Sequence, residues 1–204
     1  MALMIDKTTI ATYNHAAPEL AAYFAGIGSR LDIIKEALEL ASKPHGVRVV
    51  EVGCGDGRDA EDIVPLVEWY EGFDPSIELI KLAKKRSLRA NFVQADAVSY
   101  DYPTELDVIF GFASYLHLNR DDFTTACHKA AASLRPGGVL AMTLKERDSY
   151  QEELVEDEFG KRLFYYYDEV TVEEILKKDF GAVKVEHRTL TRKTAKWLVV
   201  LAKK

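Results

Sequence analysis

Three glycines alternate with other residues directly after a short apolar run, in the segment Gly53-Cys54-Gly55-Asp56-Gly57. Glycines at this point let the backbone turn tightly and let a ligand approach without meeting a side chain. The free N–H groups of the helix that follows face the crevice at the carboxyl end of the strand. The segment therefore predicts a site for a polar ligand, although a plain strand-to-helix turn would have the same composition.

An acidic residue follows the next apolar run, in the segment Phe73-Asp74-Pro75-Ser76. A carboxylate at the end of a second strand can accept hydrogen bonds from both hydroxyls of a ribose. The alternative is that Asp74 only begins the helix that contains Pro75. The spacing from Gly57 favours the first role, so the two segments together predict a nucleoside ligand.

The secondary-structure elements would position these residues. From residue 47 onward, short apolar runs alternate with helical stretches, as in the βαβ units of a parallel sheet. The expected strands are residues 47–52, 69–73, 91–94, 106–112 and 139–144. The expected helices among and after them are residues 59–67, 76–89, 121–134 and 171–179. Two final strands, 183–188 and 196–202, are joined by only a few residues, which predicts an antiparallel hairpin. Two helices are expected before the first strand, at residues 14–25 and 29–42.

From about Val47 to its end, the chain resembles the class I S-adenosylmethionine-dependent methyltransferases. The loop reads Gly-x-Gly-x-Gly, as in that family, whereas nicotinamide-binding folds usually show Gly-x-Gly-x-x-Gly. Residues 134–140 (LRPGGVL) are similar to the family's turn into its fifth strand, and the closing hairpin is similar to its last two strands. The resemblance implies an α/β fold with a Rossmann-like, seven-stranded, mostly parallel sheet, an antiparallel last strand and helices on both faces. It also implies one domain, in which residues 1–45 form an N-terminal helical cover over a cofactor-binding core at residues 46–204.

The cofactor that this resemblance implies is S-adenosylmethionine. By the family pattern, the three glycines of the loop would line its methionine part, Asp74 would hold its ribose, and Asp96 would lie at its adenine amino group. The full set of residues expected at the cofactor is Tyr13, Glu51, Gly53, Cys54, Gly55, Gly57, Arg58, Asp74, Pro75, Ser76, Asp96, Ala97, Phe112 and Ala113.

Three of these residues keep an alternative role. Glu51 could brace the loop without touching the ligand, because a buried carboxylate needs donors or a cation wherever it lies. Arg58 opens a helix, where its charge opposes the helix dipole, so it either meets the methionine carboxylate or extends into solvent. Tyr13 could offer its ring and hydroxyl to the cofactor from the N-terminal cover, or it could pack in the core.

The segment after the fourth strand, Ala113-Ser114-Tyr115-Leu116-His117, lies where family members bring the acceptor against the sulfonium. It resembles the Ala-Ser-x-x-His stretch of an uncharacterised branch of small methyltransferases. As the candidate catalytic residue, His117 could take a proton from a hydroxyl or amine acceptor, because its ordinary pKa of about 6.5 suits neutral pH. The alternative is that it braces the loop or contacts the adenosine.

Two further segments, 145–147 (Lys-Glu-Arg) and 165–167 (Tyr-Tyr-Tyr), combine cations with phenols. They are expected either to close over an anionic or aromatic acceptor, or to form a solvated charge run followed by an edge strand.

Composition excludes several classes of protein. A formal net charge of −6 argues against a broad basic surface for nucleic acid. No segment approaches the roughly 20 apolar residues that cross a bilayer, and the start of the chain lacks a basic region followed by an apolar one. Cys54 and Cys127 have no paired spacing, which fits a reducing cytoplasm, and no cluster of residues has metal-ligand spacing.

The function expected from these observations is methyl transfer from S-adenosylmethionine to a small-molecule acceptor by in-line displacement, in a monomer or homodimer. The alternative is a regulatory protein that binds the cofactor without turnover. A nicotinamide-dependent oxidoreductase is disfavoured by the loop spacing and the closing hairpin.

Overall fold

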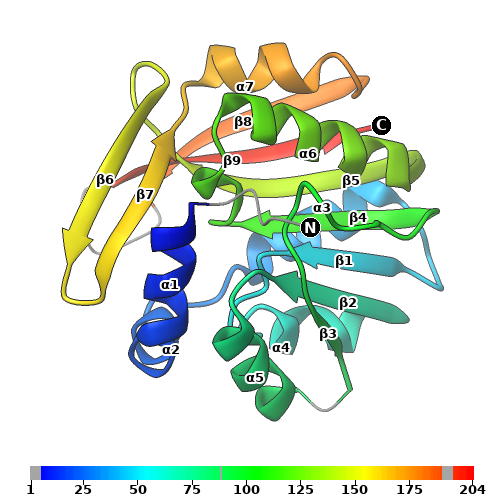
Figure 1. Cartoon of the computed structure of the whole chain (residues 1–204). Helices are drawn as coiled ribbons and strands as arrows, with labels where there is room; N and C mark the ends of the chain where they lie inside the picture. Colours follow the sequence, from blue (N-terminus) through cyan, green and yellow to red (C-terminus); the bar gives the residue numbers. More distant parts are fainter. Residues whose placement is uncertain (1–5, 88, 190–194) are drawn as a thin grey trace.

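The computed structural model describes residues 6–87, 89–189 and 195–204, and a seven-stranded sheet lies at its centre (Figure 1). The strands of this sheet are β1 (Arg48–Val52), β2 (Trp69–Asp74), β3 (Asn91–Gln94), β4 (Leu106–Phe112), β5 (Leu134–Lys145), β8 (Ala182–Thr189) and β9 (Lys196–Lys203). Their order is β3-β2-β1-β4-β5-β9-β8. The pairs among β1 to β5 are parallel, whereas β9 is antiparallel to β5 and β8. The expected mostly parallel sheet with an antiparallel last strand is confirmed.

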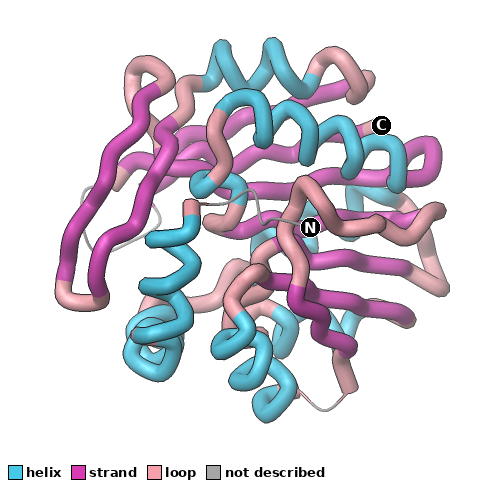
Figure 2. Tube along the Cα trace, viewed as in Figure 1, coloured by secondary structure: helices cyan, strands magenta, loops and turns pink. Residues whose placement is uncertain are grey.

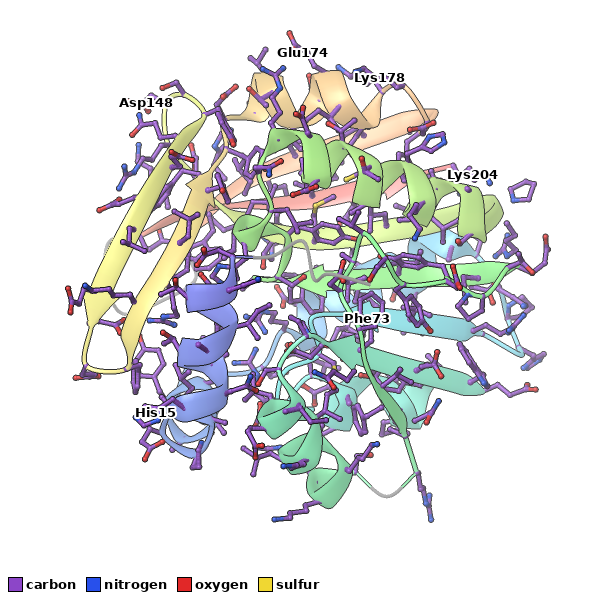
Figure 3. All side chains as sticks on the ribbon, viewed as in Figure 1. His15, Phe73, Asp148, Glu174, Lys178 and Lys204 are labelled. Carbon is purple, nitrogen blue, oxygen red and sulfur yellow. The ribbon has the colours of Figure 1, made fainter. Side chains whose placement is uncertain are left out.

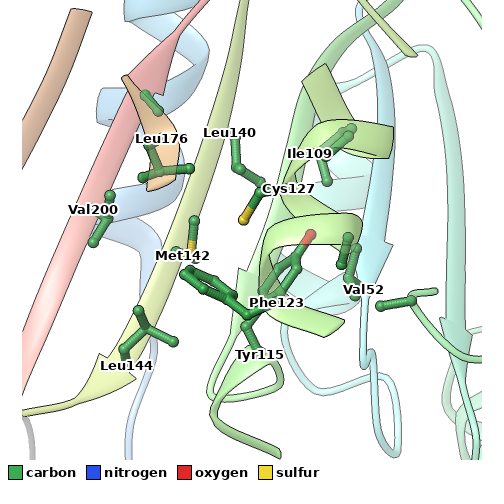
Figure 4. Packing of buried hydrophobic residues seen from close by; sticks show 14 of the residues in the cluster. Val52, Ile109, Tyr115, Phe123, Cys127, Leu140, Met142, Leu144, Leu176 and Val200 are labelled. Atoms are coloured by element: carbon green, nitrogen blue, oxygen red, sulfur yellow. The ribbon is translucent and has the colours of Figure 1, made fainter. Parts of the chain in front are cut away.

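Helices cover both faces of the sheet, as Figure 2 shows. They are α1 (Lys7–His15), α2 (Ala17–Ala25), α3 (Leu31–Ala41), α4 (Ala60–Ile63), α5 (Ile77–Arg86), α6 (Arg120–Ser133) and α7 (Glu169–Leu176), with 3₁₀ turns η1 (Val64–Leu66) and η2 (Tyr115–His117). Residues of α3, α4 and α5 share one apolar cluster with Val49, and residues of α6 and α7 share another with Val50. Adjacent residues of a strand thus enter different cores, as the two-residue period of a strand requires. The α6 side of this packing is seen in Figure 4, where Phe123 lies against Met142.

The predicted strands agree with the structure to within one residue, except at the start of β5. That strand begins at Leu134 instead of residue 139, because Leu134 already pairs with Leu106 before the ladder shifts register next to Val108. The turn expected between the last two strands falls at residues 190–194, outside the described residues.

The first predicted helix, at residues 14–25, is wrong in its start and in its continuity. The structure has two helices there, and the first begins at Lys7, after Asp6, whose carboxylate accepts a hydrogen bond from the Thr9 N–H. The second begins at Ala17, with Pro18 in its first turn. Proline is tolerated in a first turn because the N–H it lacks would have no partner there, so Pro18 marks the start of a helix and not its interior.

A second, two-stranded sheet stands beside α1 and was not predicted (Figure 1). It consists of β6 (Gln151–Asp157) and β7 (Gly160–Tyr166), paired as an antiparallel hairpin. Two hydroxyls join α1 to β7: Thr12 Oγ1 donates to the Lys161 carbonyl at 2.6 Å, and Thr9 Oγ1 accepts from the Leu163 N–H at 2.8 Å. The hairpin and α1 therefore form one wall at the side of the molecule to which β1, β2 and β4 point.

None of the described helices is long and apolar enough to cross a membrane. Within the same residues, no group of three or more His, Cys, Asp and Glu side chains is arranged to hold a metal ion.

Candidate functional site

A cavity of about 380 Å³ lies at the carboxyl ends of β1, β2, β4 and β5. Its floor is the loop after β1 together with the segments that follow β2 and β4. Its walls come from α1, from the chain that leads into α3, and from the β6–β7 hairpin. Phe73, labelled in Figure 3, lines it from the end of β2, whereas His15 lies at the exposed end of α1. Ligands of open α/β sheets bind at this position, outside the carboxyl ends of the strands.

The loop after β1 is held against its neighbours by its backbone. The N–H groups of Gly53 and Cys54 both donate to the Phe73 carbonyl, at 2.8 and 3.0 Å. Gly53 has φ +68°, and a Cβ built on it would lie 2.3 Å from the Cβ of Ser114. Gly53 is thus required for the close approach of two segments, while a Cβ on Gly55 would meet nothing within 4 Å. At Gly53 and Gly55 the loop therefore presents backbone without a side chain to the cavity.

Asp74 ends β2 with its carboxylate at the cavity. It is 8% exposed and accepts hydrogen bonds from the N–H groups of Gly55 (3.1 Å) and Ser76 (2.8 Å), one on each oxygen. Burial raises the pKa of its carboxyl to about 6, against the opposing effect of these two donors. Each oxygen keeps a free lone pair, so the group is suited to accept two more hydrogen bonds from a ligand.

Most of the residues expected at the cofactor line this cavity. They are Tyr13, Gly53, Cys54, Gly55, Arg58, Asp74, Pro75, Ser76, Ala97, Phe112 and Ala113. His117, expected at the acceptor, lines it as well.

Three expected residues do not line the cavity. Glu51 is buried beneath the loop, where it accepts a hydrogen bond from the Tyr70 hydroxyl and where burial raises its pKa. The Asp96 carboxylate is occupied by the N–H groups of Val98 and Ser99 and by the Ser99 hydroxyl. Gly57 faces α5, because a Cβ there would lie 3.2 Å from Ala83. In this arrangement, the three residues brace the site from behind.

Arg58 is neither solvated nor free, since it joins the loop to the end of α2. Its Nη1 donates to the Phe24 carbonyl at 2.8 Å, and its Nη2 pairs with Asp59 at 3.0 Å. Arg30, at the start of α3, pairs with the same carboxylate at 2.5 Å. Arg30 and Arg58 thus share the Asp59 carboxylate on the side of the cavity next to the glycine loop.

His117 connects three segments. Its Nδ1 lies 2.7 Å from the Leu163 carbonyl of β7, and its Nε2 lies 2.8 Å from the Tyr13 hydroxyl of α1. A carbonyl only accepts, so Nδ1 carries the proton and Nε2 accepts from Tyr13. Burial lowers the pKa of His117 to about 4, in keeping with a neutral ring. The lone pair that a general base would use is occupied in this arrangement.

Two cations, Lys145 and Arg162, face the cavity from the hairpin side. Arg162 is 8% exposed, pairs with Asp157, and has its guanidinium carbon 5.4 Å from the Phe164 ring centroid. Lys145 Nζ lies 3.5 Å from the same centroid, and its pKa is lowered to about 8 by burial and by Arg162. Sequence reasoning did not single out Arg162, because the hairpin that places it was not recognised.

The other members of the two segments expected over the acceptor point elsewhere. Glu146 meets His187, and Arg147 stacks on Tyr166. Glu146, Arg147 and Tyr165–Tyr167 do not line the cavity, so Lys145 alone of that set does.

Four buried polar side-chain atoms have no hydrogen-bond partner within the described residues: Ser114 Oγ, Tyr115 Oη, Arg162 Nε and Trp197 Nε1. All four residues line the cavity. Buried polar groups are almost always paired, so these four unpaired atoms set the surroundings of the cavity apart from the rest of the described residues.

Comparison with known proteins agrees with this fold. Residues 49–138 match the family model described as a methyltransferase domain. The trans-aconitate 2-methyltransferase of Rhodopseudomonas palustris is 28% identical over 103 residues, which are 48% of this chain and 39% of that protein. The ubiquinone biosynthesis O-methyltransferase of Xanthomonas euvesicatoria pv. vesicatoria is 30% identical over 125 residues, 58% of this chain and 49% of that protein. The chain thus spans half or less of the length of these two relatives.

Among solved structures, the Burkholderia thailandensis 1,6-didemethyltoxoflavin-N1-methyltransferase superposes with a TM-score of 0.72 at 20% identity, covering 96% of this chain and 86% of that one. That structure holds 1,6-didemethyltoxoflavin and S-adenosylhomocysteine. Its fold is shared over almost the whole of this chain. Together, these comparisons show that residues 49–138 match a methyltransferase domain, that the relatives are named methyltransferases, and that the chain shares the fold of a solved methyltransferase.

Proposed function

We propose that this protein transfers the methyl group of S-adenosylmethionine to a small-molecule acceptor bound in the same cavity. The observation that carries the proposal is the joint lining of one cavity by two kinds of residue. Loop glycines and a buried ribose-type carboxylate, Asp74, lie at one side, and Lys145, Arg162 and His117 lie at the other. One cavity therefore brings together residues suited to a nucleoside and residues suited to a second molecule.

The residues present fit the cofactor. Asp74 has two oxygens with lone pairs left over, as a pair of ribose hydroxyls requires. Leu79 and Ala97 offer an apolar surface for a base on the same side, and the open face of Gly55 admits the chain that joins the ribose to the methionine. When bound, the cofactor supplies an electrophilic methyl group on its sulfonium.

The contribution of the protein to the reaction is position and exclusion of water. Aligned reactants gain about 7 to 11 kcal/mol in favourable cases, so no strong base is needed. Phe112 and Phe164 give the cavity apolar walls, and α1 with the hairpin closes its outer side. His117 holds the Tyr13 hydroxyl in place through a fixed tautomer, which makes it a positioning residue. Binding without turnover, the alternative function, gains no support from the relatives, whose names all describe methyltransferases.

Two further parts of the proposal concern the setting. The buried, unpaired thiols of Cys54 and Cys127 are consistent with the cytoplasm, where thiols stay reduced. We further propose that the chain is one domain with α1 and α2 as its cover. It would act as a monomer or a homodimer.

The test is calorimetric titration with S-adenosylmethionine and S-adenosylhomocysteine, followed by transfer of a labelled methyl group to a panel of small acceptors. We expect micromolar binding to the natural chain and at least about a hundredfold weaker binding to Asp74→Ala, because charge-assisted hydrogen bonds are worth about 1.5 to 3 kcal/mol each. Asp101→Asn, on an exposed residue away from the cavity, is the control that should bind normally. Absence of binding to the natural chain would refute the proposal. Binding with no transfer to any acceptor would favour the regulatory alternative.

A further inference from the structure

The hairpin side of the cavity holds more positive than negative charge. Lys145, Arg162 and Asp157 all line it, and Asp157 is already paired with Arg162. The next carboxylate outward, Glu153, pairs with Arg147. Among the described residues, the Lys145 Nζ has no ion-pair or hydrogen-bond partner, so one positive charge remains without a counter-charge at this wall.

Arg162 carries an unused donor at the same place. Its side chain is almost fully buried, and its Nε has no partner among the described residues, although Nη2 is held by Asp157. A guanidinium group is what proteins commonly use to bind planar anions. Because Arg162 lines the cavity, its positive charge lies where an anionic ligand would meet it.

The carboxylate of the cofactor has a different pair of cations within reach. Arg58 follows the glycine loop directly, and Arg30 lies beside it on the shared Asp59. These groups line the part of the cavity formed by the loop and the start of α3, whereas Lys145 and Arg162 line the part formed by β5 and β7. The second pair is thus available to another molecule.

The surroundings of the second pair are apolar and aromatic. Phe164 lies under both cations, at 3.5 Å from Lys145 Nζ and 5.4 Å from the Arg162 guanidinium, and Trp197 and Val155 line the same side. From this geometry we infer that the acceptor is a small monocarboxylate with an apolar body, anchored by its carboxylate on Arg162 and Lys145. A monoanion matches the single excess charge, and the inference rests on the proposed function.

Burial and the nearby guanidinium of Arg162 lower the pKa of Lys145 to about 8, in keeping with its lack of an ion-pair partner among the described residues. A bound carboxylate would restore the pKa by supplying the missing anion.

The test uses protein saturated with S-adenosylhomocysteine and pairs of probes that differ only in charge: 4-hydroxybenzoate with 4-hydroxybenzamide, cinnamate with cinnamamide, and hexanoate with hexanamide. Binding is measured by calorimetry and by ligand-observed NMR. We expect at least one carboxylate to bind tenfold or more tightly than its amide. The variants Lys145→Gln and Arg162→Gln should each lose at least tenfold in that affinity, while their affinity for S-adenosylhomocysteine stays within threefold of that of the natural chain.

Two variants provide controls of opposite kind. Asp157→Asn removes the competing anion and should tighten carboxylate binding, whereas Lys161→Gln, on the exposed side of β7, should leave it unchanged. If Arg162→Gln fails to fold, Lys145→Gln and Asp157→Asn still give opposite predicted signs.

The outcomes separate the two claims. If no carboxylate binds better than its amide, the inference is wrong while the proposed function stands. A fall in affinity for S-adenosylhomocysteine in both Lys145→Gln and Arg162→Gln would assign these cations to the cofactor and would also overturn the inference. A natural chain that binds neither S-adenosylmethionine nor S-adenosylhomocysteine would refute the proposed function, and the inference would fall with it.

Discussion

Asp74 makes cofactor binding depend on pH in a way that can be worked out from its surroundings. Without ligand, burial holds the pKa of this carboxyl at about 6, above its ordinary value of 3.8. Ribose hydroxyls would donate to the ionised form and lower the pKa again, so binding releases a proton when the pH is below 6. Affinity must therefore fall as the pH falls through 6. A full return from about 6 to 3.8 corresponds to about 3 kcal/mol at low pH.

Between pH 5 and pH 7, a range in which binding can be measured, this shift in pKa predicts about tenfold weaker binding of S-adenosylhomocysteine at pH 5. The reason is that Asp74 is about nine tenths protonated at pH 5 in the protein without ligand. The ligand's α-amino group, with a pKa near 8, stays charged throughout this range. Calorimetry in two buffers of different ionisation enthalpy would give both the affinity and the number of protons released.

Asp74→Asn is the matched variant, because it keeps the shape of the side chain and removes the titrating group. Its affinity should be low and nearly flat between pH 5 and 7. Asp56, the neighbouring carboxylate whose charge also raises the pKa of Asp74, is paired with Arg86 and is unchanged in the variant. A natural chain without the slope, or a variant that keeps it, would show that Asp74 does not hold the ribose.

Two further predictions concern stability and are measured by urea unfolding. Gly53→Ala should lower the free energy of unfolding by at least about 2 kcal/mol, since it adds strain at positive φ and a clash with Ser114. Gly55→Ala should add only the strain, about 1 to 2 kcal/mol. Equal losses in the two variants would contradict the close approach of Gly53 to Ser114. Tyr13→Phe should lower the free energy of unfolding by about 1 to 3 kcal/mol, because it leaves the buried Nε2 of His117 without a donor. Tyr23→Phe, on a ring that is 48% exposed, should change it little. A similarly small loss in both variants would contradict the tautomer assigned to His117.

The inner strands of the central sheet could be predicted from the sequence because they are buried on both faces. In β4 every residue from Leu106 to Phe112 is buried, and such mostly apolar runs, each followed by a turn, are strong local signals. The positions of Gly53 and Asp74 followed from the same signals, since Gly53 comes directly after β1 and Asp74 is the last residue of β2. Their chemistry is therefore encoded by neighbours in the chain.

The acceptor side could not be predicted in the same way. Strand β6 is exposed along most of its length, so its sequence of charged residues shows no apolar alternation. The place of Arg162 is set by contacts with α1, about 150 residues away in the chain, through Thr9 and Thr12. The occupied lone pair of His117 likewise depends on Tyr13, which lies 104 residues earlier. Contacts of this kind leave no local pattern.

The β6–β7 hairpin interrupts the chain between β5 and α7 without entering the central sheet. The segments that carry Gly53 and Asp74 lie before this interruption and pair only with strands of the main sheet. Under the proposed function, the residues that hold the cofactor and those of the hairpin that contact its acceptor lie in separate parts of the sequence. Substitutions in this one hairpin would then change the Arg162 and Phe164 side of the acceptor site and leave the methyl donor site unchanged.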